Sequence, residues 1–225
     1  MKNAGKYDAL SLLKTADGSY TLSNSELGET YHNRHGAITE SRHVFIEHGL
    51  KHLQHLHQVQ LLEVGFGTGL NAWLTWNFCV TNRLPVLYHA LEPLPLPEHL
   101  CPVPMDASSM EVERWKKLHA SPWEQKTVLD EMFELWKTKQ KVEQFFLAPQ
   151  TLDLVYFDAF APGYQAEIWE PSVFGRLIEM MKIGAVLVTY CAKGSVRRTM
   201  QQCGFQVERL PGPPGKREML RASKH

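Results

Sequence analysis

A glycine-rich turn separates a strand-like segment from a helix-like one, and this order restricts the fold of the chain most strongly. The strand-like segment is 59–64 (VQLLEV), and Gly65, Gly67 and Gly69 follow it directly. Apolar residues then recur with the spacing of one helix face, at Leu70, Trp73, Leu74 and Phe78. A strand, a glycine turn and a helix predict the opening of a βαβ unit, and therefore an α/β fold.

The remaining segments continue this alternation and predict an open, mostly parallel α/β sheet. Further strands are predicted at 86–91, 132–136, 152–157, 185–190, 205–210 and 218–222. Helices are predicted from Gly36 to His57, from Trp169 to Gly184 and over 194–203, with one or two more in 106–150. An Asp17-Gly18 turn predicts a hairpin near the N-terminus. We therefore expect a small annex at 1–35 and a main domain at 36–225.

Composition limits the kind of protein that this sequence can encode. The 225 residues carry 24 Lys and Arg against 24 Asp and Glu, and 44% are hydrophobic, which suits one folded domain. Zero net charge excludes a polybasic nucleic-acid coat and leaves room only for a local basic patch. The N-terminus has no signal-peptide pattern and no apolar run reaches membrane-spanning length, so we expect a cytoplasmic protein without membrane association.

Neither the cysteines nor the histidines predict a metal site. Cys79, Cys101, Cys191 and Cys203 have no C-x-x-C spacing and are expected to be reduced thiols. The four histidines at 48–57 alternate with leucines and have no cysteine or carboxylate partners at ligand spacing. A polar helix face explains them better than a metal centre. Trp115, Trp123 and Trp136 are expected in the core of a helical insertion.

Ligands of open α/β sheets bind beyond the carboxyl ends of the strands, where Gly65, Glu92 and Asp158 are expected. The turn lacks the third glycine of the dinucleotide fingerprint, and no G-K-[ST] follows it, so neither phosphate-binding motif is present. Glu92, at the end of the next strand, can accept hydrogen bonds from two ribose hydroxyls. A nucleoside site without phosphate groups indicates S-adenosylmethionine. The alternative is a tight turn followed by a solvated strand end.

The segment Asp158-Ala-Phe160-Ala-Pro162 is a second candidate site at the same edge of the sheet. Its aspartate can accept a hydrogen bond from an amine, and Phe160 can stack on a base. Because a free Asp has a pKa of about 3.9, we expect it chiefly to orient the amine and to stabilise positive charge on nitrogen. The alternative is that Asp158 caps the following helix.

Five blocks resemble, in order, the methyltransferase domain of the MnmC family of tRNA-modification enzymes. They are GETYHNRHGAITESRHVF, LLEVGFGTGLNAWLT, VYFDAFAPGYQAEIWEPSVF, VTYCAKGSVRRTMQQCGF and PGPPGKREMLRA, within residues 15–95 and 150–222. The resemblance implies a Rossmann-like class I methyltransferase fold with a seven-stranded sheet and helices on both faces. It also implies methylation, dependent on S-adenosylmethionine, of the 5-aminomethyl group of wobble 2-thiouridine in tRNA, giving 5-methylaminomethyl-2-thiouridine.

The resemblance also implies roles for individual residues. Those expected to bind the cofactor are Glu63, Gly65, Gly67, Gly69, Glu92 and Asp158, of which Asp158 is also the catalytic acid that receives the amine. Those expected to bind the substrate are Tyr31, Phe160, Pro162, Lys193, Lys216 and Arg217. His32 and Arg42 are expected to close over the site together with Tyr31.

Two departures from the family accompany this resemblance. Many relatives read adenine with a Gly-Asp pair, whereas the corresponding Thr138-Lys139-Gln140 has no acid. The bifunctional family members continue into an FAD-dependent oxidase domain, but this sequence ends at His225. We therefore expect methylation alone, on an aminomethyl group that another enzyme supplies.

Charge is unevenly distributed, since bases gather from Lys182 to the C-terminus and acids in 106–143. A basic edge of this kind fits a tRNA substrate that is bound transiently, although a solvated helix face is an alternative explanation. No separate protein partner is expected. The competing functions are a spermidine-synthase-like aminopropyltransferase, a small-molecule amine methyltransferase and a non-catalytic RNA-binding module. Only Asp158 is apparent as an acid for a polyamine, which counts against the first.

Overall fold

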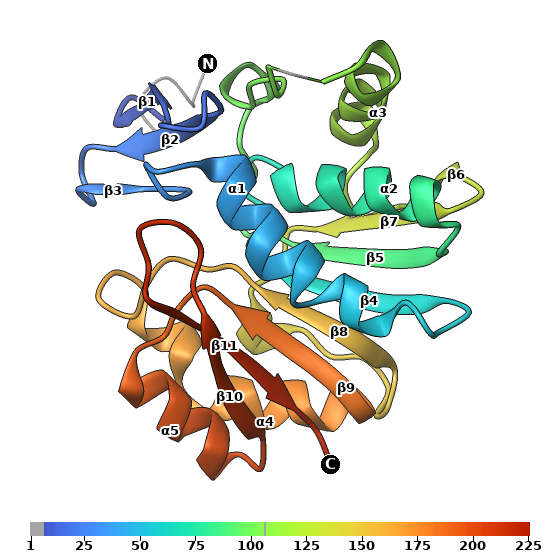
Figure 1. Cartoon of the computed structure of the whole chain (residues 1–225), viewed down its shortest axis with the longest axis vertical. Helices are drawn as coiled ribbons and strands as arrows, with labels where there is room; N and C mark the ends of the chain where they lie inside the picture. Colours follow the sequence, from blue (N-terminus) through green and yellow to red (C-terminus); the bar gives the residue numbers. More distant parts are fainter. Residues whose placement is uncertain (1–6, 106) are drawn as a thin grey trace.

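The computed structural model describes residues 7–105 and 107–225, and a single eight-stranded sheet organises most of them (Figure 1). The strand order is β10-β11-β9-β8-β4-β5-β7-β6. The bounds are β4 (Val59–Val64), β5 (Val86–Leu91), β6 (Lys126–Asp130), β7 (Phe133–Thr138), β8 (Leu152–Phe157), β9 (Met181–Thr189), β10 (Gln206–Pro211) and β11 (Glu218–Ser223). The five central strands from β9 to β7 pair in parallel, whereas β6, β10 and β11 pair antiparallel. The predicted Rossmann-like α/β class is confirmed.

The sheet has one strand more than the seven expected. The additional strand is β6, an edge strand paired with β7, and its central residue Val128 is 70% exposed. A short edge strand with little burial gives a weak hydrophobic pattern, which explains why the sequence did not reveal it. By contrast, every residue of β8 is buried, as its continuous apolar run predicts for a central parallel strand.

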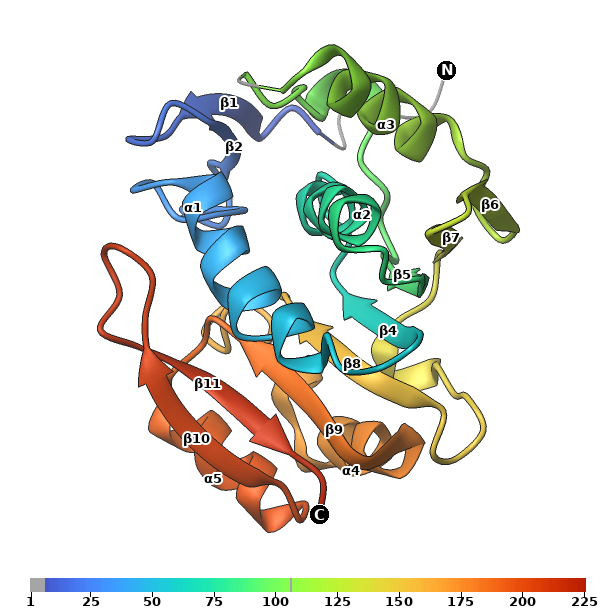
Figure 2. The same cartoon turned by 45° about the vertical axis from the view of Figure 1, so that its right-hand side comes forward.

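Helices cover both faces of the sheet (Figures 1 and 2). On one face lie α1 (Ala37–Ser41), α2 (Leu70–Asn82) and α3 (Ser109–Ala120), which share a core with Trp73 and Trp115. On the other face lie α4 (Pro171–Met180) and α5 (Gly194–Gln202), which pack around Phe157 and Phe174. The two cores hold the central strands rigidly, so the loops at their carboxyl ends have a fixed base.

Two predicted helix ends are wrong. The first helix is interrupted: α1 continues into a π-helical turn (Arg42–Glu47) and then a 3-10 turn (Leu50–Leu53), so His57 lies beyond it. Gly49 breaks the regular helix where its backbone packs closely against Phe45, Tyr156 and Val188. The helix expected to reach Gly184 ends at Met180, because Met181 already pairs with Leu152 in the sheet.

The N-terminal annex contains a small antiparallel sheet of β1 (Leu10–Lys14), β2 (Tyr20–Asn24) and β3 (Glu29–Thr30). The predicted hairpin at Asp17-Gly18 joins β1 to β2, and Gly18 has a φ of 86°. The Asp17 carboxylate accepts hydrogen bonds from the amide and hydroxyl of Thr39, which fastens the hairpin to α1. The domain boundary at residue 35 stays a prediction. Residues 1–6 of the annex lie outside the described residues.

Candidate active site

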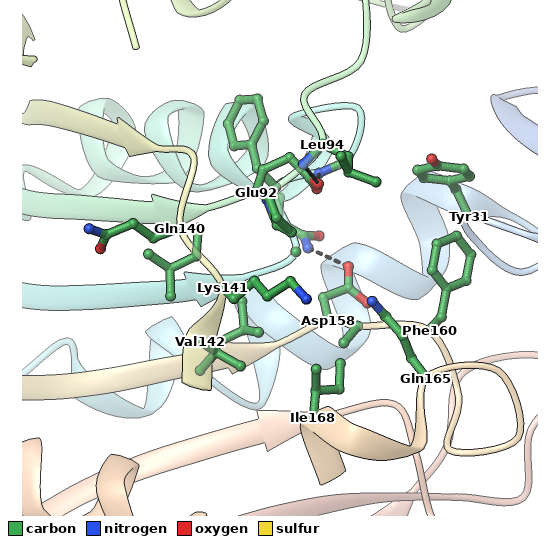
Figure 3. A pocket seen from close by; sticks show the side chains of 18 of the residues that line it. Tyr31, Glu92, Leu94, Gln140, Lys141, Val142, Asp158, Phe160, Gln165 and Ile168 are labelled. Atoms are coloured by element: carbon green, nitrogen blue, oxygen red, sulfur yellow. Dashed lines mark hydrogen bonds between the residues drawn. The ribbon is translucent and has the colours of Figure 1, made fainter. Parts of the chain in front are cut away.

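A cavity of about 700 Å³ lies at the carboxyl ends of the central strands, where the sequence predicts a site (Figure 3). Its walls come from the turns after β4, β5 and β8, from the annex at Tyr31 and His32, and from the segment 139–144. The volume falls in the range of roughly 300–1,000 Å³ typical of small-molecule sites. Of the described helices, none is long and apolar enough to cross a membrane.

The glycine turn forms the floor of this cavity with a backbone that excludes side chains. Gly65 has a φ of 93°, and a Cβ there would lie 2.3 Å from the carbonyl oxygen of Asp158. Gly67 has a φ of 50°, and its Cβ would point at the Tyr31 ring 3.4 Å away. Gly69 instead begins α2 with a φ of 80° and packs against Phe66 without lining the cavity. The glycines therefore let a ligand approach the backbone closely.

Glu92 turns its carboxylate towards the glycine turn, as its place after β5 predicts. Its Oε2 atom accepts a hydrogen bond from the Gly67 amide at 3.1 Å, and its Oε1 atom accepts one from the Leu94 amide at 3.0 Å. Each carboxylate oxygen can accept a second hydrogen bond. The side chain is thus held at the cavity wall, beside the glycine turn.

Asp158 lies at the opposite wall and is unlike a free aspartate. Burial, together with the negative charge of Glu40, raises its pKa from 3.8 to about 7. Hydrogen bonding from Asn71 and the positive charge of Lys216 act in the opposite direction. The expectation of a weak base with an ordinary pKa is therefore wrong: near neutral pH this carboxyl group can both accept and release a proton.

Glu63 and Asn71 support Asp158 from behind the cavity wall. Glu63 is fully buried, and burial beside Asp158 raises its pKa well above the usual value. The Asn71 side-chain nitrogen donates to Glu63 at 3.0 Å and to Asp158 at 2.7 Å. Glu63 was expected to bind the cofactor, but it lies behind the cavity wall and does not line the cavity.

Aromatic side chains shape the open side of the cavity. The rings of Tyr31 and Phe160 meet edge to face with centroids 5.0 Å apart, and Tyr190 donates from its hydroxyl to the Ala159 carbonyl at 2.8 Å. Trp169 holds the loop from beneath through a hydrogen bond to the Phe160 carbonyl. In Figure 3 the Phe160 ring lies below the Tyr31 ring, beside the Asp158 carboxyl group. The predicted convergence of the annex and the loop after β8 is present.

Four expected substrate residues do not line the cavity. Pro162 stiffens the loop beside it, Lys193 and Arg217 are exposed, and Lys216 forms a 2.6 Å ion pair with Glu40. The Lys216 Nζ atom also lies 3.8 Å from the centroid of the Tyr190 ring. Arg42 is likewise exposed and away from the cavity wall, whereas His32 lines it.

Several lining residues were not predicted from the sequence. They are Asn71, Lys141, Glu143, Gln144, Gln165 and Glu167. Thr138, Lys139 and Gln140 indeed have no acid, but Glu143 lies a few residues further along the same wall. The polar residues of the loop after β7 follow no helix or strand periodicity. Only the position of this loop at the end of a strand could have indicated that it lines the cavity.

The cysteines form no disulfides, and the described side chains include no group arranged to bind a metal ion. Cys79, Cys101, Cys191 and Cys203 are free thiols. Within residues 7–105 and 107–225 no group of three or more His, Cys, Asp or Glu side chains is arranged to hold a metal ion. Trp115 packs edge to face on Trp73 in the core, as predicted, whereas Trp123 and Trp136 are only partly buried and Trp136 lies in β7, so the helical insertion expected around all three is wrong.

Comparison with known proteins agrees with this geometry. The model of a family described as S-adenosyl-L-methionine-dependent methyltransferase matches residues 112–225. The chain belongs to this methyltransferase family. The accessible backbone of Gly65 and Gly67 in the cavity, and the Glu92 carboxylate beside it, fit its cofactor, S-adenosylmethionine.

Relatives of this methyltransferase include two bifunctional MnmC proteins of tRNA 5-methylaminomethyl-2-thiouridine biosynthesis. The protein from Nitrosospira multiformis is 26% identical over 214 residues, covering 88% of this chain and 34% of the relative. The protein from Aromatoleum aromaticum is 29% identical over 232 residues, covering 95% and 35%. This methyltransferase thus spans about a third of the length of these relatives.

Two solved structures share the fold of this methyltransferase. MNMC2 from Aquifex aeolicus superimposes with a TM-score of 0.80 at 26% identity, covering 95% of this chain and 70% of that one. Spermidine synthase from Thermotoga maritima superimposes with a TM-score of 0.57 at 11% identity, covering 95% and 68%. The second likeness shows the fold alone.

Proposed function

We propose that this methyltransferase transfers a methyl group to the amino nitrogen of 5-aminomethyl-2-thiouridine in tRNA. The observation that carries the proposal is the position of Asp158, an acid of pKa about 7, in the same cavity as the glycine turn and Glu92. The likeness to MnmC proteins and to MNMC2 over most of the chain supports this substrate. A tRNA substrate also fits a cytoplasmic protein.

The proposed chemistry requires a neutral amine beside an activated methyl group. When bound, S-adenosylmethionine supplies an electrophilic methyl group. In our proposal the cofactor lies against the backbone of Gly65 and Gly67, and Glu92 accepts hydrogen bonds from its ribose hydroxyls. Gly69 fixes the end of the turn, and Glu63 lies behind Asp158 and supports it. Asp158 accepts the proton of the substrate ammonium, which leaves the nitrogen lone pair free to attack. When the amine instead arrives neutral, Asp158 stays ionised, and its carboxylate stabilises the positive charge that develops on nitrogen.

Substrate recognition is proposed to begin at the aromatic edge of the cavity. Tyr31 and Phe160 offer faces and edges on which a uracil ring can pack, and Gln165 reaches towards Asp158 (Figure 3). Pro162 keeps the loop after β8 in place. Lys193 and Arg217 are exposed and can contact phosphates, whereas Lys216 acts through its ion pair with Glu40.

One observation keeps a polyamine substrate as a second candidate. Besides Asp158, the carboxyl groups of Glu92, Glu143 and Glu167 line the cavity, more acids than the sequence suggested. A diamine carries an ammonium group at each end, and several carboxylates could form ion pairs with these groups. The aromatic pair and the tRNA-modifying relatives favour the nucleoside, and the two substrates are separated experimentally.

The test is a substrate panel with S-adenosylmethionine carrying a labelled methyl group. The acceptors are tRNA with 5-aminomethyl-2-thiouridine, the same tRNA without modification, and putrescine. We expect label only in the aminomethyl tRNA, on the amino nitrogen after digestion to nucleosides. Label in putrescine alone would replace the proposal with a small-molecule amine methyltransferase. With decarboxylated S-adenosylmethionine, formation of spermidine would indicate aminopropyl transfer.

A further inference from the structure

Asn71 connects the cofactor turn to the catalytic acid through a single side-chain atom. It lies in the first turn of α2, two residues after Gly69, and is 3% exposed. Its Nδ2 atom donates one hydrogen bond to Glu63 and the other to Asp158, the second drawn as a dashed line in Figure 3. An amide nitrogen has two hydrogens, so both are used.

The two bonds join Asn71 to acids in different surroundings. The bond to Asp158 is 2.7 Å long and the bond to Glu63 is 3.0 Å long. Glu63 is fully buried, burial raises its pKa well above the usual value, and the Tyr88 hydroxyl faces it. Of the residues that the structure describes, Asn71 alone donates a side-chain hydrogen bond to Asp158.

We propose that Asn71 is the positioning residue of this active site: its amide holds the Asp158 carboxylate towards the cavity and favours its ionised, proton-accepting form. This rests on the proposed function, since it assigns Asp158 the proton of the amine. Because α2 begins directly after the glycine turn, the same residue fixes the acid relative to the cofactor floor. A donor here offsets part of the cost of a buried carboxylate.

Other groups around Asp158 set the background against which Asn71 acts. These are Glu40 of α1, Glu63 of β4, Tyr190 directly after β9 and Lys216 of the loop before β11. Glu40 opposes ionisation of Asp158 and Lys216 favours it, whereas burial raises the pKa of Glu63 and of Tyr190. Substitution of Asn71 leaves Glu40, Tyr190 and Lys216 unchanged and removes a donor only from Glu63 and Asp158, so a change in the Asp158 titration reports on the amide.

The test compares Asn71→Ala and Asn71→Asp by direct titration and by turnover. Titration of the Asp158 carboxyl carbon by NMR, assigned with Asp158→Asn, needs no tRNA. We expect the pKa of Asp158 to rise by about one unit in N71A and further in N71D, which also brings a third carboxyl group. The rise of kcat with pH moves in the same order, and kcat at pH 7 falls by about fivefold in N71A and further in N71D. The Kd for S-adenosylmethionine changes by less than about threefold.

The matched control is Asn77→Asp, the same substitution on the same helix, where the side chain meets Arg114 away from the cavity. It should titrate and turn over like the original protein. An unchanged Asp158 titration in both Asn71 variants, or a loss of kcat without any pH shift, would overturn the positioning role. If the unsubstituted enzyme methylates no aminomethyl tRNA, the proposed function fails, but the NMR titration still decides the role of Asn71.

Discussion

Asp158 is held in a state that should reduce the stability of the folded protein near neutral pH. Its pKa is 3.8 in an unperturbed chain and about 7 in the fold, where burial and Glu40 oppose ionisation. Between these two pH values the unfolded chain loses the Asp158 proton before the folded chain does. The unfolded state then binds fewer protons, so stability falls as pH rises through this window.

The magnitude follows from the size of the pKa difference. Each pKa unit corresponds to about 1.4 kcal/mol, so ionising Asp158 costs the folded state up to about 4 kcal/mol. Asp158 lines an open cavity that water can enter, and we therefore expect about half, on the order of 2 kcal/mol. Asp158→Asn removes this cost, because a neutral amide of the same shape can still accept a hydrogen bond from Asn71.

The assay is thermal unfolding of D158N and the unsubstituted protein at pH 5 and pH 8. At pH 8 we expect Tm to rise by roughly 4–8 °C for a chain of this length, and at pH 5, where about a third of the window between the two pKa values has been crossed, by about a third as much. Asp153→Asn is the matched control, because Asp153 accepts from Lys182 and from the Gln60 amide, and it should lower Tm at pH 8. If the Tm of D158N at pH 8 equals or lies below that of the unsubstituted protein, ionised Asp158 does not destabilise the fold and this prediction is refuted.

Two further substitutions test the surroundings of this acid. Glu40→Gln removes a negative charge near Asp158 and leaves Lys216 unopposed, so the rise of kcat with pH should move down by roughly 0.5–1 pH unit. The Tm of this variant should fall, because a mostly buried ion pair is broken. A shift of the kcat–pH profile to higher pH would contradict the charges assigned to Glu40 and Lys216. Gly65→Ala places a Cβ against the Asp158 carbonyl at positive φ, so calorimetry should show S-adenosylmethionine binding at least about 10-fold more weakly. Gly175→Ala, in the open middle of α4, is its control and should gain up to about 1 kcal/mol of stability.

The parts of the site that follow directly after strands were predictable from the sequence. The glycine turn and Glu92 each follow a strand-like run directly, and parallel strands bring their carboxyl ends to one edge. Asp158 follows β8 in the same way and was placed correctly. Local pattern and sheet topology together were therefore enough to locate the cavity floor and both walls.

The charge state of the site could not be predicted, because it depends on residues that are distant in sequence. Lys216 meets Glu40 across a separation of 176 positions, and Asn71 meets Asp158 across 87. Burial of Asp158 among these groups, and not its residue type, raises its pKa. Lys216 was expected to contact the substrate, but it pairs with Glu40 instead. Glu40 lies on α1, and no local sequence pattern links α1 to the segment that contains Lys216.

The central claim is that Asp158 drives methylation of the tRNA aminomethyl group without being needed to hold the cofactor. The most direct test measures S-adenosylmethionine binding by calorimetry and single-turnover methylation of tRNA containing 5-aminomethyl-2-thiouridine, in the unsubstituted enzyme and in Asp158→Ala. We predict a Kd within about threefold of the original and a turnover rate lower by about 100-fold or more. Near-normal methylation by D158A, or the absence of any methylated nucleoside from the unsubstituted enzyme, would contradict the account.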